Sequence, residues 1–103
     1  MEQRSYQEEV GLPTFKVRWH RHVHADLAEI NAGIVENLVV GTEYRLSRAP
    51  AHIGIPLKGT AHRLWRIGYA KYWVVYTINI EFREVWVLSV QQPEAVLRHP
   101  QIL

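Results

Sequence analysis

The spacing of apolar residues changes twice along the chain, and this change restricts the fold more than any other feature. Residues 14–20 alternate between apolar and polar side chains, which is the pattern of a half-buried strand. From about His22 to Leu46 the apolar residues recur at helical spacing instead. After residue 62 the strand pattern returns. The chain must therefore combine helices with a sheet.

The helical part predicts two consecutive helices with a short joint between them. Val23, Leu27 and Ile30 form the first apolar stripe, and a second stripe runs from Ile34 to the end of the helical region. Glycine is a poor helix former, so Gly33 is expected to break or bend the helix between the two stripes. Two helices with a short joint suggest a helical hairpin.

The second half of the chain predicts three strands in succession. Ala49–Pro56 contains two prolines and a glycine and is expected to be a connector. Residues 62–67, 72–80 and 83–90 are β-branched, aromatic or alternating, and the short links between them favour an antiparallel meander. The predicted fold is α+β, with an N-terminal strand and a two-helix hairpin packed on a mainly antiparallel sheet of about four strands.

Length and composition limit the class of protein. A chain of 103 residues fits one domain, and we expect residues 1–12 to form an arm before a single domain at 13–103. Cysteine is absent, which excludes disulfides, thiolate metal sites and a cysteine nucleophile, and favours a reducing cytoplasm. No apolar run approaches the roughly 20 residues of a membrane span, so a cytoplasmic protein without a membrane partner is expected.

Charge is unevenly distributed along the chain. Residues 44–80 contain six basic residues and no acidic one, so this window carries +6 while the rest of the chain carries −4. A segregated basic segment in a small domain favours binding to a polyanion, with nucleic acid first among the candidates. A set of ordinary solvated lysines and arginines remains the alternative interpretation.

Three segments of the basic window resemble a known family. Pro56–Gly59, Leu64–Ile67 and Tyr72–Tyr76 are similar to the Leu-x-Gly turn, the aromatic-Arg-hydrophobic strand and the Tyr-Arg-Val-hydrophobic-Tyr strand of the RelE/ParE superfamily of bacterial toxins. The two predicted helices agree with the helical hairpin of that superfamily. The resemblance covers roughly residues 14–99.

This resemblance implies the toxin half of a toxin–antitoxin pair, with a cognate antitoxin as partner. The nuclease branch of the superfamily cleaves messenger RNA on the ribosome without a metal or other cofactor, whereas another branch inhibits DNA gyrase. Gly68, Trp73 and Pro93 stand where the nuclease branch usually carries cations. A gyrase inhibitor and a decayed nucleic-acid-binding module are therefore kept as alternatives to a ribosome-dependent endoribonuclease.

The same resemblance, together with the chemistry of RNA cleavage, gives the candidate site residues. Cleavage needs a cation on the phosphate and groups that move protons, and Arg66 and His99 match the family positions for these two roles. Strand alternation predicts that His62 shares a face with Arg66, roughly 13 Å away. The predicted RNA-binding residues are Lys58, His62, Arg63, Lys71 and Arg98.

Three histidines alternate along the chain where the first strand is expected to meet the first helix. On an extended strand His20, His22 and His24 would project from one face, which suits zinc or nickel. The run crosses the strand-to-helix junction, however, where that shared face would be lost. No metal site and no cofactor are predicted for this chain.

Overall fold

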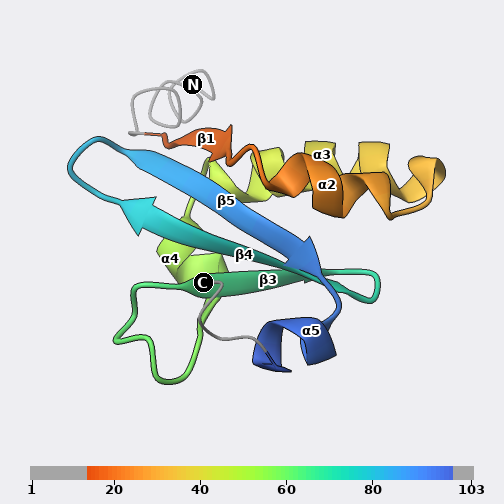
Figure 1. Ribbon diagram of the computed structural model, residues 1–103. Helices are drawn as coiled ribbons and strands as arrows, with labels where there is room; N and C mark the ends of the chain where they lie inside the picture. Colours follow the sequence, from red (N-terminus) through yellow and green to blue (C-terminus); the bar gives the residue numbers. More distant parts are fainter. Residues whose placement is uncertain (1–13, 99–103) are drawn as a thin grey trace, which may run out of the picture.

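The sheet is five-stranded, and its strand order places the first and last strands of the chain side by side. The computed structural model describes the backbone of residues 14–98 and the side chains as far as Val96. Across the sheet lie β1 (Lys16–Trp19), β5 (Glu84–Gln91), β4 (Tyr72–Asn79), β3 (Trp65–Tyr69) and β2 (Ile55–Pro56) (Figure 1). β1 pairs parallel with β5, and every other pair in this sheet is antiparallel. The predicted α+β class is confirmed.

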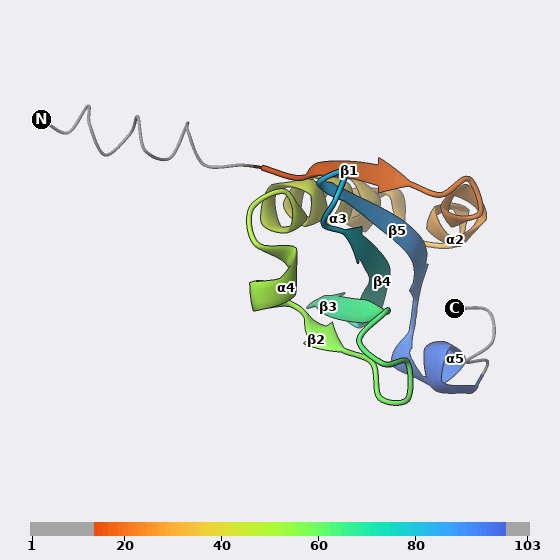
Figure 2. The same cartoon turned by 90° about the vertical axis from the view of Figure 1, so that its left-hand side faces the viewer.

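Four helices accompany the sheet within residues 14–98: α2 (Val23–Ala28), α3 (Ala32–Leu46), α4 (Pro50–Ile53) and α5 (Pro93–Arg98). Figure 2 shows α3 and α4 on one side of the sheet and α5 on the other. The predicted helical hairpin corresponds to α2 and α3, but the expected break at Gly33 was wrong. The helix break falls at residues 29–31, because Asn31 caps α3 by accepting a hydrogen bond from the Gly33 N–H at 2.7 Å.

The main core lies between the sheet and the helices α2 and α3. Its buried members from the sheet include Val74, Tyr76, Val85 and Val87, and those from the helices are Val23, Leu38 and Leu46. A second, smaller cluster lies on the opposite face of the sheet, where Val96 of α5 packs with Leu57, Leu64 and Val75. We call this second face the outer face. α5 covers the part of it around Val75.

Tyr76 joins the sheet to α4 through a buried hydrogen bond. Its hydroxyl donates to the Pro50 carbonyl at 2.7 Å, and burial raises the pKa of this hydroxyl far above its usual range. A Cβ placed on Gly54 would lie 1.7 Å from the same hydroxyl, so a glycine is needed there for close approach. This contact positions β2 beside β3.

The structure corrects several element predictions. The expected connector Ala49–Pro56 contains α4 and the edge strand β2, so the sheet has five strands rather than about four. The strand predicted over 62–67 begins only at Trp65, because Ala61 and His62 adopt left-handed backbone angles, with φ of 55° and 61°. α5, which follows the last strand, was not predicted.

Part of the predicted organisation lies outside the residues that the structure describes. The whole of the expected arm (1–12) and the two ends of the predicted domain lie in residues 1–13 and 99–103, outside the described residues. Among residues 14–98, none of the helices has the length and apolar character needed to span a bilayer.

Candidate nucleic-acid interface

Arg66 lies on the outer face, at the second position of β3. Its guanidinium carbon stands 4.0 Å from the centre of the Trp73 ring, in the geometry of a cation–π contact. Trp73 itself packs against the second cluster, which fixes the surface on which Arg66 rests. The Trp73 ring thus supports the guanidinium from one side. The residue is half-buried and remains able to bind a phosphate oxygen from the open side.

A basic cavity lies on the same face, between the loop before β3 and strands β4 and β5. It has a volume of about 490 Å³. Its lining residues are Lys58, Gly59, Thr60, Arg63, Leu64, Thr77 and Leu88. Thr60 organises the loop, since its hydroxyl donates to the Leu57 carbonyl and its own carbonyl accepts from Arg63 Nε at 3.1 Å. The structure therefore places Lys58 and Arg63 beside the same cavity. Both residues are among those predicted to bind RNA.

A row of outer-face side chains continues from this cavity across three strands. Thr77 of β4 is the cross-strand partner of Trp86 of β5, and Trp86 is the partner of Arg18 of β1. A second row beside it consists of Asn79, Glu84 and Lys16. Because aligned residues on neighbouring strands share a face, all of these side chains project on the side away from α3. We call the row Thr77–Trp86–Arg18 the tryptophan row.

Hydrogen bonds fix the position of the tryptophan row. Arg18 Nε donates to Glu84 Oε2 at 2.8 Å, and the indole N–H of Trp86 donates to Glu84 Oε1 at 3.1 Å. The hydrogen bond from Arg18, followed by that from Trp86, lowers the pKa of Glu84 below its usual value. Glu84 thus stays ionised and holds both the guanidinium and the indole in one orientation. Arg18 also lies 5.9 Å above the Trp86 ring.

Sequence reasoning did not identify the tryptophan row. The alternation of residues 14–20 correctly predicts that Lys16 and Arg18 share a face, and the structure confirms it. The contact of Arg18 with Trp86 cannot be predicted from the local sequence, because the two residues become neighbours only through the parallel pairing of β1 with β5.

Two predicted residues do not join this face. The prediction that His62 shares a strand face with Arg66 is wrong, because His62 lies in the turn before β3. Its ring lies 6.1 Å from that of Trp65, which packs on the side of the main core. Lys71 lies in the β3–β4 turn, 5.8 Å from the ring of Tyr72, and Tyr72 also packs against the main core. His99 and the side chain of Arg98 lie outside the described residues.

The cations of the outer face are free of carboxylate partners, apart from Arg18. Arg18–Glu84 is the single ion pair found among the described residues. Lys16, Lys58, Arg63 and Arg66 have no such partner among residues 14–96. Unpaired cations on one face provide favourable sites for the phosphates of a nucleic acid.

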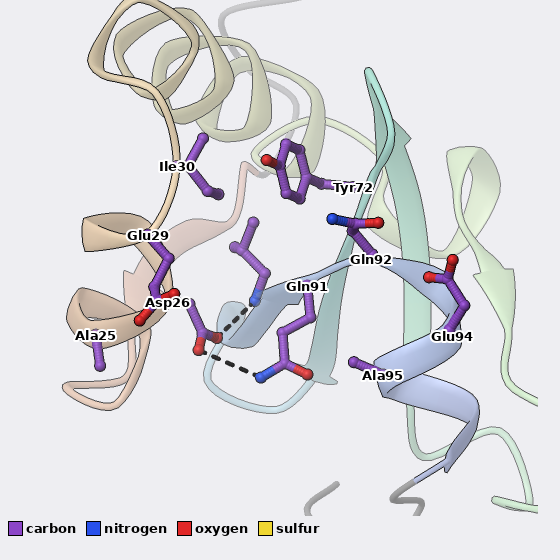
Figure 3. Close-up of a pocket in the computed structure, with 10 residues that line it drawn as sticks. Ala25, Asp26, Glu29, Ile30, Tyr72, Gln91, Gln92, Glu94 and Ala95 are labelled. Carbon is purple, nitrogen blue, oxygen red and sulfur yellow. Dashed lines mark hydrogen bonds between the residues drawn. The ribbon is translucent and has the colours of Figure 1, made fainter.

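A larger cavity, of about 670 Å³, lies at the opposite end of β5 and has the opposite charge (Figure 3). Asp26, Glu29 and Glu94 line it, together with Tyr72 and the two glutamines that follow Val90. Asp26 accepts hydrogen bonds from the Val90 N–H at 2.9 Å and from Gln91 Nε2 at 3.3 Å, so its carboxylate ties α2 to the end of β5. Its negative charge makes this cavity unsuitable for phosphate groups.

The histidine run is divided by the strand-to-helix junction. His20 Nδ1 accepts a hydrogen bond from the His22 N–H, and the two rings meet edge to face at 4.5 Å. His24 lies within α2. Across residues 14–96, no three histidine or acidic side chains are grouped closely enough to hold a metal ion.

The order of the strands and the placement of the helices define a class of protein. The chain has a RelE/ParE-like toxin fold, as the sequence resemblance predicts. No family model matches the chain, and no curated protein matches it in sequence.

Several solved structures are similar to this chain in fold. A chain in the crystal structure of the RelBE2 toxin–antitoxin complex from Mycobacterium tuberculosis is 25% identical, with a TM-score of 0.72, covering 79% of this chain and 93% of that one. A free E. coli RelE toxin in which two arginines are replaced by alanine is 17% identical, with a TM-score of 0.67, covering 86% and 94%. A chain of the archaeal RelE–RelB complex from Pyrococcus horikoshii OT3 is 16% identical, with a TM-score of 0.59, covering 77% and 94%.

Proposed function

We propose that this chain is the toxin of a toxin–antitoxin module and that it cleaves messenger RNA bound to the ribosome. The observation that carries the proposal is the outer face, where Arg66 rests on Trp73 beside a cavity that contains Lys58 and Arg63. These cations lie on the exposed side of a sheet whose fold is that of the RelE toxins. The proposed site of action is the cytoplasm, where ribosomes and messenger RNA are found.

The reaction assigned to this face is an internal attack within the RNA. The 2′-oxygen bonds to the adjacent phosphorus, and the bond from phosphorus to the 5′-oxygen of the next nucleotide breaks. A base takes the 2′-hydroxyl proton, and an acid returns a proton to the leaving oxygen. Arg66 would stabilise the charge that develops on the phosphate oxygens. His99 is proposed for a proton transfer, because it follows directly after α5, which packs on the outer face.

An antitoxin is the proposed protein partner. Two of the similar structures, from Mycobacterium tuberculosis and Pyrococcus horikoshii, are toxin–antitoxin complexes. A polypeptide that covers the unpaired cations of the outer face would be acidic, and it would block the access of RNA to Arg66. Co-expression with the product of a neighbouring reading frame, followed by co-purification, would identify this partner.

The first prediction concerns cleavage. Purified wild-type protein added to ribosomes that carry messenger RNA should produce new RNA ends, detected by primer extension. Arg66→Ala should lower the cleavage rate at least about 100-fold, since a lost transition-state contact of this kind is typically worth that much. His99→Ala should lower it by a similar factor.

Arg48→Gln is the matched control for this experiment. Arg48 also stacks on an aromatic ring, 4.4 Å from Tyr44, but it lies beyond the end of α3 and away from the outer face. Its substitution should leave cleavage unchanged. If Arg66→Ala and His99→Ala cleave at the wild-type rate, the assigned site is wrong.

Gyrase inhibition is the second candidate function, and one observation favours it. Gly68 and Trp73 leave Arg66 as the sole cation on β3 and β4 that faces outward among the described residues, and Pro93, at the start of α5, stands in place of a further expected cation. A gyrase inhibitor should block DNA supercoiling while messenger RNA stays intact. A decayed binding module would do neither, and its overexpression would leave cells unharmed.

A further inference from the structure

The tryptophan row lies next to the basic cavity, and the two form one continuous strip. Thr77 belongs to both, because it lines the cavity and is the cross-strand partner of Trp86. From Thr77 across Trp86 to Arg18 the strip spans two strand spacings, about 10 Å. It therefore has cations at each end, Lys58 and Arg63 on one side and Arg18 on the other, with an aromatic ring between them.

The strip matches the chemistry of single-stranded nucleic acid. Proteins that bind a single strand combine cations that follow the phosphates with aromatic rings on which unpaired bases stack. Trp86 is half-buried, so part of its ring is open to solvent, and its indole is fixed by the hydrogen bond to Glu84. A ring held in this way loses little freedom when a base stacks on it.

No helix covers this part of the sheet among the described residues. α5 packs over the region around Val75 and Leu64 through Val96, whereas Thr77, Trp86 and Arg18 lie nearer the β4–β5 turn. Among the described residues the strip is therefore uncovered. Lys58 and Arg63 have no carboxylate partner there, whereas Arg18 is paired with Glu84 through its Nε.

We propose that the tryptophan row is a nucleotide subsite separate from the Arg66 centre: Trp86 stacks an unpaired base of the RNA, while Arg18 and the Lys58–Arg63 cavity bind the phosphates on either side. This inference rests on the proposed function in one respect, since it takes single-stranded RNA as the ligand. Glu84 is a positioning residue, because it acts through Arg18 and Trp86 and does not itself touch the RNA.

The test measures binding without cleavage. The full chain is titrated with a fluorescent ten-nucleotide 2′-O-methyl oligoadenylate, whose blocked 2′-oxygen cannot attack the phosphate. The binding result is then independent of whether the protein is a nuclease. Trp86→Leu should weaken binding at least about fivefold, and Trp86→Phe, which keeps an aromatic ring, should recover most of the affinity. Arg18→Gln should weaken binding, and Arg48→Gln should leave it unchanged.

A second ligand isolates the stacking contribution. The same oligonucleotide with its bases removed should bind the wild type more weakly than the intact one. Trp86→Leu should bind the two oligonucleotides equally, because it has no ring to distinguish them. This comparison also uses the Trp86→Phe variant, so the test survives if the leucine variant does not fold.

Three results would overturn the subsite. They are wild-type affinity in Trp86→Leu, equal affinity of the wild type for intact and base-free oligonucleotides, and no detectable binding of either. A loss confined to Trp73→Leu would assign the stacking to the ring beneath Arg66 instead. Stronger binding of duplex DNA than of the single strand would also contradict the proposal, because bases within a duplex are already stacked.

Discussion

At the scale of single residues, Gly54 has the least room for a side chain of the glycines that the structure describes. The Tyr76 hydroxyl reaches the Pro50 carbonyl only because position 54 has no side chain in the way. Tyr76 belongs to the main core, on the face of the sheet opposite the proposed RNA strip, and its hydroxyl joins β4 to α4. This contact offers a measure of stability that is independent of RNA binding.

The second prediction is that Gly54→Ala lowers the free energy of unfolding by about 1–3 kcal/mol, the usual cost of forcing a methyl group into a filled space. Urea denaturation of the full chain checks it. Tyr76→Phe alone should cost about 1–2 kcal/mol, because it leaves the buried Pro50 carbonyl without its donor.

The double variant provides the internal control. Removing the hydroxyl also removes the closest atom to the added methyl, so Gly54→Ala should cost less in the Tyr76→Phe background than in the wild type. Strict additivity of the two costs would show that the methyl and the hydroxyl do not compete for the same space.

Residue-level prediction succeeded where a side chain follows from strand alternation and failed where the backbone leaves the ordinary regions. Lys16 and Arg18 were expected to share one face of the first strand, and the structure places both on the outer face. His62 was wrong, because a non-glycine residue with positive φ leaves no trace in the hydrophobic pattern.

At the scale of secondary-structure elements, α3 is the longest helix among the described residues and contains two informative positions. Asn31 caps its first turn, and Gly41 lies in its interior with no heavy atom within 4 Å of the position a Cβ would occupy. The helix is therefore stabilised at its start and weakened in its middle.

The third prediction follows from these two positions. Gly41→Ala should raise the free energy of unfolding by up to about 1 kcal/mol, because alanine has the higher helix propensity and the space is open. Asn31→Ala should lower it by about 1 kcal/mol, through loss of the cap. Thermal and urea denaturation measure both changes.

Asn31→Ser is the matched control, since serine also caps a helix and should retain most of the stability. A lower stability of Gly41→Ala would contradict the open space beside that residue. An unchanged stability of Asn31→Ala would mean that the Gly33 N–H finds another acceptor.

The long elements could be predicted from periodicity, whereas the short ones could not. α3, β4 and β5 each extend the apolar pattern over eight residues or more, and β1, though it has only four residues, lies within a clear alternation. β2 has two residues and exists only because β3 lies beside it. The irregular pairing at Val75 and Tyr76 likewise depends on the partner strand, not on the local sequence.

At the scale of the whole molecule, charge is separated between two surfaces. The outer face carries Lys16, Arg18, Lys58, Arg63 and Arg66, and the cavity at the opposite end of β5 carries Asp26, Glu29 and Glu94. This separation would orient an approaching polyanion, because attraction on one surface is combined with repulsion on the other.

The fourth prediction is a strong dependence of oligonucleotide binding on salt. The logarithm of the binding constant should fall linearly with the logarithm of salt concentration, and each cation that contacts a phosphate of a single strand contributes about 0.7 to the slope. Arg63→Gln should reduce the slope by about that amount. Lys71→Gln is the control, because Lys71 lies beside Tyr72 on the side of the main core. An equal reduction by both variants would mean that only the net charge of the protein matters.

The basic window at residues 44–80 contains part of the cationic outer face. Two cations of that face lie far outside the window. Lys16 and Arg18 come from the first strand, in the part of the chain that carries a net negative charge. Strand order, which sequence periodicity does not provide, places them beside the residues of the window.

The pairing of β1 with β5 also determines when the molecule becomes complete. Arg18 and Glu84 are 66 positions apart, so their contact closes a loop that contains most of the domain. Contacts over such separations form late in folding. During synthesis the first strand emerges long before β5, its partner. Until β5 is made, Val17 and Trp19 lack the strand that places them against the main core. A nascent chain that stops before Glu84 has neither the ion pair nor Trp86, so the tryptophan row is complete only after β5 has been synthesised.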